Sequence, residues 1–256
     1  MGIEVFQGGG GIARITIDNP SRRNALDITM FRDLADAWRV LDADRSVRCV
    51  ILRGSGEEAF CSGADLSVDW DACQDRDVLI DQALLKSRVF SKPIIAAING
   101  HCVAGGFELA LAADIRVART DARFGLPEVR WGIFPSGGGA LKLTRQIPRA
   151  LAMELLLTGR LISAERACES GFLNAVVASS ALDDWALSAA EAICSNSPAA
   201  VQAVRAFCAG LELGDPASSA QALREQTCVD RVRESGDWRE GVAAFLEKRT
   251  PDYPDR

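Results

Sequence analysis

Histidine is almost absent from this chain, since His101 is the single histidine among 256 residues. A metal site with two or three histidine ligands is therefore excluded. A serine hydrolase triad would have to use His101, and the sequence has no Gly-x-Ser-x-Gly motif to present the nucleophile. His101 follows Asn-Gly after an apolar run, where we expect a local structural role. With histidine this scarce, carboxylates are the expected acid and base groups.

An excess of positive charge is also lacking. The chain has 29 basic and 35 acidic residues and a formal net charge of -6. This balance gives no electrostatic basis for binding nucleic acid, and an RNA-binding scaffold is the less favoured interpretation. No window approaches the 18 uninterrupted apolar residues of a transmembrane helix, and the N-terminus lacks the pattern of a signal peptide. We expect neither a nucleic-acid nor a membrane partner.

Cysteine is present, but no two cysteines form a Cys-x-x-Cys pair. Several lie in apolar runs, which is typical of reduced, buried thiols in a cytoplasmic protein and not of a disulfide framework or zinc site. We therefore expect a cytoplasmic protein without a bound metal. The eight cysteines are Cys49, Cys61, Cys73, Cys102, Cys168, Cys194, Cys208 and Cys228.

Apolar periodicity predicts strands that alternate with helices. Residues 13–18 alternate in the manner of a half-buried strand, and Asp27 can cap a helix with an apolar stripe at helical spacing. Short, wholly apolar runs suit strands that are buried on both faces. The rhythm indicates an α/β fold with a helical C-terminal part. The expected strands cover residues 13–18, 49–52, 94–98, 115–118 and 172–177; the expected helices cover residues 27–42, 77–90, 106–113, 140–146, 148–159 and most of the chain after 182.

The chain is organised around residues 99–128, which contain two glutamates in unusual settings. Glu108 lies inside the apolar run Phe107 to Leu111, and Glu128 follows a proline. A carboxylate is costly to bury, so one in an apolar run is either paired or kept for chemistry. We predict that Glu108 and Glu128 are the acid and base groups of one active site.

Structural interpretations of both glutamates remain open on the sequence alone. Glu108 could be a buried helix residue paired with Arg116 or Arg123. Glu128 could be a surface residue that begins a helix, where the helix dipole favours negative charge.

The paired glycines before Glu108 form a turn between an expected strand and an expected helix. Backbone N–H groups at such a helix N-terminus lack intrahelical partners and point outward. The pattern Ala-Gly-Gly-Phe-Glu lacks the Gly-x-Gly-x-x-Gly of a dinucleotide-binding loop, so that interpretation is poor.

Several segments together resemble the crotonase (enoyl-CoA hydratase/isomerase) superfamily. Their order and spacing are specific and extend over essentially the whole chain. The matching segments are Asn24-Ala25-Leu26, Cys61 to Leu66, Pro93 to Leu111, Phe124 to Glu128, Leu157-Thr158-Gly159 and Phe245 to Arg249.

The resemblance implies a spiral of repeated ββα units with a C-terminal helical region that packs subunits into trimers, often paired into hexamers. We accordingly expect a spiral core over residues 1–195 and a helical trimerisation region over residues 196–256. A homo-oligomer, either a trimer or a dimer of trimers, is the expected assembly.

The resemblance also implies a coenzyme A thioester as substrate. The backbone N–H groups of Ala64 and Gly105 match the two donors that hold the thioester oxygen in the family. Glu108 and Glu128 match the family's two catalytic glutamates.

Further site residues follow from the same resemblance. Arg22 and Arg23 could be a merely solvated turn, but contacts to coenzyme A phosphates are the sharper interpretation. The coenzyme A site is expected to include Arg22, Arg23, Ala25, Ser62, Ala64, Asp65 and Leu66, with Lys248 reaching it from a neighbouring subunit. The acyl pocket is expected to be lined by Trp70, Trp131 and Phe134. Phe107 and the run Ser136 to Ala140 depart from the common family pattern, which bears on the identity of the acyl group.

The expected function is an enoyl-CoA hydratase, a lyase that needs no metal and no cofactor beyond the coenzyme A of its substrate. An isomerase of the same fold is the nearest alternative, but the presence of both glutamates favours hydration. A non-catalytic acyl-CoA-binding scaffold is the alternative from another class.

Overall fold

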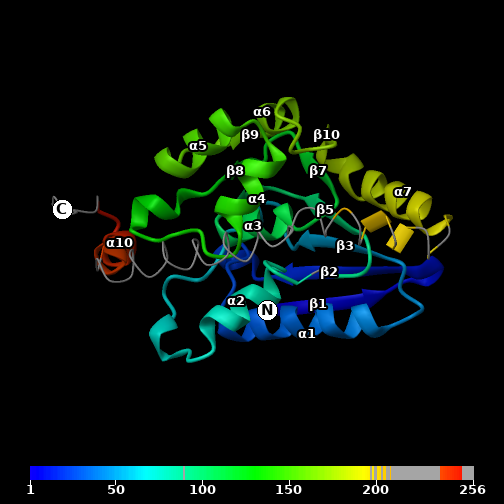
Figure 1. Ribbon diagram of the computed structural model, residues 1–256, viewed down its shortest axis with the longest axis horizontal. Helices are drawn as coiled ribbons and strands as arrows, with labels where there is room; N and C mark the ends of the chain where they lie inside the picture. The colour runs from blue at the N-terminus through cyan, green and yellow to red at the C-terminus, as the bar shows by residue number, and fades with distance from the viewer. Residues whose placement is uncertain are drawn as a thin grey trace.

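Three successive units of two strands and a helix organise the molecule (Figure 1). In each unit the first strand joins a large sheet and the second strand joins a small one. The expected ββα spiral is therefore confirmed by the strand order. The units are β3 (Cys49–Gly54), β4 (Ala59–Cys61) and α2 (Arg76–Ala83); β5 (Ile94–Ile98), β6 (His101–Val103) and α3 (Gly105–Leu111); and β7 (Ile115–Arg119), β8 (Arg123–Gly125) and α4 (Gly139–Gln146).

The computed structural model describes residues 1–88, 90–196, 198, 201, 202, 204, 205, 208 and 237–249. The remaining elements in these ranges are β1 (Gly2–Gln7), β2 (Ile12–Asp18), α1 (Ile28–Ala43), α5 (Arg149–Thr158), β9 (Ile162–Ser163), α6 (Ala164–Glu169), β10 (Ala175–Val177), α7 (Leu182–Cys194) and α10 (Asp237–Leu246). Short 3-10 turns are η1 (Gly9–Gly11), η2 (Pro20–Arg22), η3 (Trp70–Ala72), η4 (Pro127–Trp131) and η5 (Ser179–Ala181).

The large sheet has the order β1-β2-β3-β5-β7-β10. Only its β1–β2 pair is antiparallel, and the four other pairs are parallel. Every residue of β5 is buried, which explains its uninterrupted apolar sequence. Helix α7 packs on one face through Leu182, Ala186 and Ala190, while the main core lies on the other face.

Helix α1 forms where the apolar stripe predicts it. The Asp27 carboxylate caps its N-terminus by accepting a hydrogen bond from the N–H of Met30 at 2.8 Å. The stripe residues Met30, Phe31, Leu34, Trp38 and Leu41 are all buried in the main core.

A helix forms where the sequence predicts one over residues 77–90, but α2 spans Arg76–Ala83, so the predicted end at residue 90 is wrong. The helix ends at Ala83, and Leu85 takes a left-handed conformation with φ 50°. The Asp81 carboxylate accepts hydrogen bonds from the N–H of Ser87 at 3.1 Å and its hydroxyl at 2.8 Å. These bonds turn the chain back and end the helix, because aspartate and serine side chains compete with helical hydrogen bonding.

The small sheet has the order β4-β6-β8-β9, and β4, β6 and β8 run parallel. Their carboxyl ends therefore meet at one edge. Three residues singled out in the sequence follow these ends directly: Ala64 after β4, Gly105 after β6 and Glu128 after β8. Ligand sites of open parallel sheets lie outside the carboxyl ends of the strands, so we expect an active site at this edge.

The C-terminal helical region expected over residues 196–256 lies largely outside the described residues. Helix α10 is described, and it packs against η4 (Figure 1). The rings of Trp131 and Phe245 meet edge to face at 5.0 Å. Because the structure contains one chain, the expected trimer or hexamer stays a prediction.

Across the described residues, no helix combines the length and apolar character needed to span a membrane.

We predict that Phe172→Ala lowers the free energy of unfolding by about 3–5 kcal/mol. Phe172 is 1% exposed and packs edge to face on Phe107 at 4.7 Å and on Phe124 at 5.6 Å, so its loss leaves a cavity between both rings. Urea denaturation measures the change. Phe6→Ala is the control, because Phe6 is 68% exposed and its loss should cost less than about 0.5 kcal/mol. Equal losses in the two variants would contradict the prediction.

Candidate active site

The turns after β4 and β6 bring the backbone of Ala64 beside Gly105. A Cβ atom on Gly105 would lie 3.8 Å from the Ala64 nitrogen and 3.3 Å from the Gly63 Cα. A Cβ atom on Gly63 would lie 2.8 Å from the Gly105 nitrogen. Glycine at both positions permits this approach.

The N–H of Ala64 is unshared, meaning that it makes no hydrogen bond within the described residues, whereas the N–H groups of Gly63 and Asp65 on either side do. The Gly63 N–H donates to the Cys61 sulfur at 3.4 Å, and the Asp65 N–H donates to the Leu26 carbonyl at 2.9 Å. The Leu26 N–H in turn donates to the Gly63 carbonyl at 2.8 Å, which fixes the turn from both sides. Within residues 1–88 and 90–196, the Ala64 N–H donates to no acceptor.

The N–H of Gly105 is the first of helix α3 and has no carbonyl one turn before it. Ala104 precedes it in a strained conformation, φ 51° and ψ -130°, and its own N–H donates to the Gly125 carbonyl at 3.0 Å. No acceptor for the Gly105 N–H occurs in the part of the chain that the structure describes. Two unshared backbone donors, those of Ala64 and Gly105, therefore lie side by side at the sheet edge.

Glu108 lies in the first turn of α3, and its side chain is 4% exposed. Its Oε1 accepts a hydrogen bond from the N–H of Gly139 at 2.9 Å. Gly139 is the first residue of α4, so the carboxylate faces a helix N-terminus, where partial positive charge favours an anion.

Two glycines, Gly137 and Gly139, lie close to the Glu108 carboxylate. A Cβ on Gly137 would lie 2.4 Å from Glu108 Oε2 and 2.4 Å from Leu84 Cδ1. A Cβ on Gly139 would lie 3.0 Å from Glu108 Oε1 and 2.9 Å from Leu126 Cδ1. The glycine run after Ser136 is thus what lets the chain wrap closely around this carboxylate.

Glu128 lies in η4 and is 8% exposed. Its Oε2 is buried and finds no hydrogen-bond partner among the described residues. Burial, and next the charge of the nearby Glu108, raise the pKa of Glu128 well above its ordinary value. The interpretation of Glu128 as a surface residue is therefore wrong, and this carboxyl favours its protonated form.

The arginines proposed as structural partners of Glu108 have other contacts. Arg116 donates to the Gln146 side chain at 2.5 Å, and its guanidinium lies 4.6 Å from the centre of the Phe172 ring. Arg123 donates to the backbone carbonyls of Asp121 and Ala122.

Part of the expected coenzyme A set gathers beside Ala64. Arg22 forms an ion pair with Asp65 and donates to the Ser67 hydroxyl at 2.7 Å. Burial raises the pKa of Asp65, but hydrogen bonds from Ser67 and Arg22 outweigh this and hold the pKa below its usual range. The Ser62 hydroxyl donates to the Arg22 carbonyl at 3.4 Å. A parallel bridge between Leu26 and Ala64 brings Ala25 to the same turn, and Leu66 is half-buried at its end.

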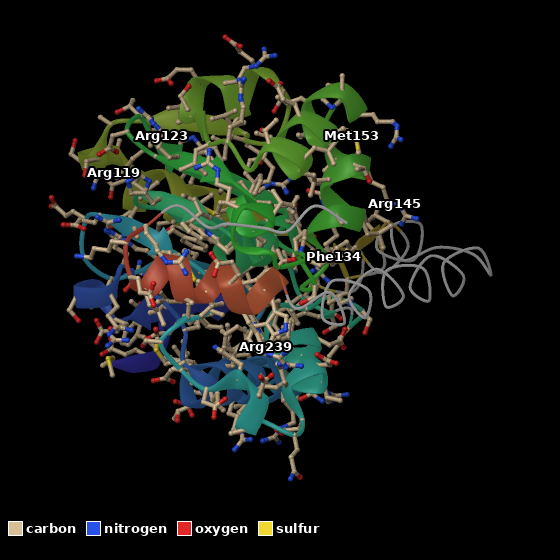
Figure 2. The ribbon with its side chains drawn as sticks, turned by 90° about the vertical axis from the view of Figure 1, so that its left-hand side faces the viewer. Arg119, Arg123, Phe134, Arg145, Met153 and Arg239 are labelled. Atoms are coloured by element: carbon tan, nitrogen blue, oxygen red, sulfur yellow. The ribbon has the colours of Figure 1, made fainter. Side chains whose placement is uncertain are left out.

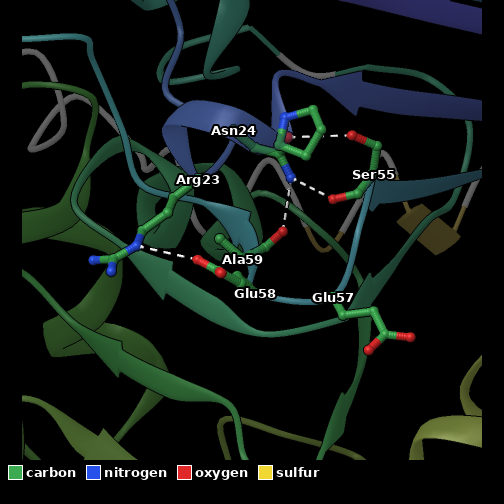
Figure 3. A pocket seen from close by; sticks show the side chains of 7 residues that line it. Arg23, Asn24, Ser55, Glu57, Glu58 and Ala59 are labelled. Atoms are coloured by element: carbon green, nitrogen blue, oxygen red, sulfur yellow. Dashed lines mark hydrogen bonds and ion pairs between the residues drawn. The ribbon is translucent and has the colours of Figure 1, made fainter.

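Arg23 points elsewhere. It pairs with Glu58 at 3.5 Å across a surface pocket (Figure 3). The Asn24 amide donates to the carbonyls of Ser55 and Ala59 in the wall of this pocket. None of Ala64, Gly105, Glu108 and Glu128 lines it, so this pocket is separate from the two donors and the two carboxyl groups.

The three residues expected to line the acyl pocket have different neighbours, and their role in an acyl pocket stays a prediction. Trp70 donates from its indole N–H to the Asp65 carbonyl at 2.9 Å and packs on Phe31. Trp131 faces α10 through Phe245. Phe134 is half-buried and appears in Figure 2 on the side of the molecule where α10 lies. Lys248 is exposed just after α10, and its predicted contact with a neighbouring subunit stays a prediction.

The sequence interpretation missed Leu84, Gly137 and Gly139. Leu84 Cδ1 would lie 3.7 Å from a Cβ on Gly105 and 2.4 Å from a Cβ on Gly137, so Leu84 lies between the second backbone donor and the glycine run. Leu84 was hidden inside an expected helix. The glycine run was a usable signal, because consecutive glycines indicate close backbone approach.

The described residues contain no group of three or more histidine, cysteine, aspartate or glutamate side chains that could hold a metal ion.

Comparison with known proteins gives consistent matches over the whole chain. Residues 7–256 match the family model described as enoyl-CoA hydratase/isomerase. The chain is 41% identical to enoyl-CoA hydratase EchA19 of Mycobacterium tuberculosis, over 94% of this chain and 92% of that protein. It is 40% identical to (E)-benzylidenesuccinyl-CoA hydratase of Thauera aromatica, over 94% and 95%. The crystal structure of carnitinyl-CoA hydratase from Mycobacterium avium superposes with a TM-score of 0.89 at 34% identity, covering 99% of this chain and 98% of that chain.

We predict that the stability of the protein falls as pH rises above the ordinary carboxyl pKa of about 4.3 and that Glu128→Gln removes this fall. The folded state keeps the Glu128 proton after the unfolded chain has lost it, because the folded pKa is the higher one. In that window the slope reaches about 1.4 kcal/mol for each pH unit and ends at the folded pKa. Urea denaturation at about pH 5, 6 and 7 measures the difference between variant and wild type, which should grow with pH.

Glu169→Gln is the matched control, since Glu169 is exposed and lies outside this site. Its curve should run parallel to that of the wild type. Parallel curves for Glu128→Gln as well would show that this carboxyl is ionised in the folded protein, contrary to the prediction.

Proposed function

The chain belongs to the enoyl-CoA hydratase/isomerase family, and on this premise we propose that it adds water reversibly across the double bond of a 2-enoyl-CoA thioester to give a 3-hydroxyacyl-CoA. One observation carries the proposal: two buried carboxyl groups, Glu108 and Glu128, lie close enough to interact electrostatically. They belong to the same sheet edge as the unshared N–H groups of Ala64 and Gly105.

The first requirement of this reaction is a site for negative charge on the thioester oxygen. Attack at Cβ moves electrons through Cα onto that oxygen. The N–H groups of Ala64 and Gly105 would receive it, and such donors need no reorganisation when the charge develops. One donor of this kind lowers the barrier by roughly 3 kcal/mol.

The second requirement is a base for water and an acid for Cα, and the surroundings of the two glutamates separate these roles. Glu108 accepts the Gly139 N–H at a helix N-terminus, which favours its carboxylate. Glu128 has a raised pKa and an unpartnered Oε2, which favour its protonated form. We assign Glu108 as the base that takes a proton from water as the oxygen attacks Cβ, and Glu128 as the acid that protonates Cα.

Protons balance over the cycle. Glu108 gains one proton and Glu128 loses one, so exchange with water restores both, and dehydration uses the same groups in reverse. Because the two carboxyl groups interact, they titrate as a unit.

The thioester itself is assigned to the turn after β4. We propose that Arg22, Ala25, Ser62, Ala64, Asp65 and Leu66 bind coenzyme A, since they gather beside the Ala64 donor. Arg22 is exposed beside Asp65 and can meet a phosphate as well. We further propose a cytoplasmic homo-oligomer, trimeric or a dimer of trimers, without a cofactor beyond the substrate's coenzyme A.

A non-catalytic acyl-CoA-binding scaffold is the rival from another class. A buried carboxyl oxygen without a hydrogen-bond partner, such as Glu128 Oε2, is costly, and binding alone gives no reason to keep one. Isomerisation within the same fold needs a single acid group to move the proton. The second carboxyl group therefore favours hydration over both rivals.

We predict that Glu108→Gln and Glu128→Gln each lower the rate of hydration by about 100- to 10,000-fold, the usual contribution of a positioned acid or base. The loss of absorbance of crotonyl-CoA measures the rate. Glu169→Gln should keep the wild-type rate, as an exposed glutamate outside the site. Full activity in both site variants would refute the assignment, and turnover by double-bond migration without water addition would favour the isomerase.

We also predict that Gly137→Ala lowers kcat by about 100-fold, the cost of displacing a reacting group by about 1 Å. The new Cβ would meet the ends of the Glu108 and Leu84 side chains at 2.4 Å, and these can shift while the backbone stays in place. Gly9→Ala is the control, because nothing lies within 4 Å of a Cβ there. Unchanged kcat in Gly137→Ala would mean that the position of Glu108 does not limit the reaction.

A further inference from the structure

We propose that Cys61 and Cys102 are positioning residues, whose buried thiol groups set the orientation of the Ala64 and Gly105 backbone donors. This inference deepens the proposed function and rests on it, because it concerns the same pair of donors.

The two cysteines are brought together by an irregularity in the small sheet. Ala59 pairs with His101, yet Cys61 pairs with Cys102, so β4 has one residue more than β6 over this interval. Such a bulge re-aims the side chains that follow it and is frequent next to active sites. Cys61, the last residue of β4, and Cys102, the middle residue of β6, become direct neighbours. Both are 0% exposed and lie just before the donor turns.

Cys61 acts on the first donor turn. Its sulfur accepts the Gly63 N–H at 3.4 Å, so that N–H is engaged within the protein. The next N–H along the chain is the unshared one of Ala64. Without the sulfur, the Gly63 N–H would be a buried donor in need of a partner, and the turn could rotate to find one.

Cys102 acts on the second donor turn. Its thiol donates to the carbonyl of Gly106 at 3.4 Å, one residue after the donor Gly105 in the first turn of α3. Gly106 also lies against β4, since a Cβ there would be 2.1 Å from the Cys61 carbonyl oxygen and 2.8 Å from the Cys61 Cβ. The Cys61 thiol thus contacts the first donor turn and the Cys102 thiol contacts the second. The two turns also contact each other through Cys61 and Gly106.

The chemistry of both thiols suits this role and not that of a nucleophile. Burial raises the pKa of Cys61 to about 12 and raises the pKa of Cys102 well above its ordinary value. Both groups stay protonated, and a protonated thiol is a weak donor and weak acceptor that is tolerated in an apolar core. A thiolate attack on substrate is excluded by the same burial.

The test combines Cys61→Ala and Cys102→Ala with the conservative variant Cys61→Ser, which keeps an acceptor for the Gly63 N–H. We expect each alanine variant to lower kcat roughly tenfold, since a donor shifted by a fraction of an ångström should cost less than the 100-fold of a full 1 Å misplacement. KM should change less than kcat, because coenzyme A is held by other residues. Cys61→Ser should recover part of the loss.

A spectroscopic readout separates positioning from general destabilisation. Cinnamoyl-CoA, a conjugated thioester, absorbs at longer wavelength when donors polarise its carbonyl group. The bound shift should be large in wild type, smaller in both alanine variants at saturation, and partly restored in Cys61→Ser. Cys49→Ala is the matched control, because Cys49 is equally buried but lies in the separate core under α7. It should lower the melting temperature and leave kcat and the bound shift unchanged.

The outcomes distinguish this inference from the proposed function. Unchanged kcat and unchanged shift in the two alanine variants would overturn the role of the thiols, as would equal losses in Cys49→Ala. A wild-type protein that shifts the absorbance of cinnamoyl-CoA but hydrates no enoyl-CoA would sink the proposed function, and the variants' shifts would still decide the role of the thiols. A wild type that produces no shift would overturn the donor pair and the inference together.

Discussion

Electrostatic repulsion between two buried carboxyl groups is the constraint that the rest of the site accommodates. Two adjacent charges in a poorly solvated place are unfavourable, so one group must hold a proton. An asymmetry favours Glu128 as that group: burial raises its pKa and its Oε2 has no hydrogen-bond partner among the described residues, whereas Glu108 Oε1 accepts the Gly139 N–H. The glycine run, the start of α4 and the position of η4 all serve that asymmetry.

A second constraint is steric and concerns the approach of backbone to backbone. The turn after β4 and the start of α3 lie so close that a Cβ on Gly106 would overlap the Cys61 carbonyl at 2.1 Å. This closeness places two N–H groups from distant parts of the sequence beside one another. Both donors belong to the backbone, so their spacing is set by the packing of the two turns and not by the rotamers of their own side chains.

The sequence was informative where a local rule decides the structure and poor where a distant contact does. Helix α1 follows from its cap and stripe, and the buried strands follow from apolar runs. The pairing of Glu108 with Glu128, and of Ala64 with Gly105, rested on family resemblance, because no local pattern reports distance in space. Helix α2 was overestimated because the Asp81–Ser87 turn competes with helical bonding, and Leu84 was missed with it. The bulge that aligns Cys61 with Cys102 has no sequence signature.

The placement of each functional group after a different strand of the small sheet has a consequence for how such a protein can evolve. The first donor follows β4, the second donor and Glu108 follow β6, and Glu128 follows β8. An exchange in the segment after β8 can therefore remove or relocate one acid group without disturbing the two donors. The groups that we propose for catalysis thus lie on separate turns around the two backbone donors, an arrangement that would let one scaffold diversify its chemistry by altering one turn at a time.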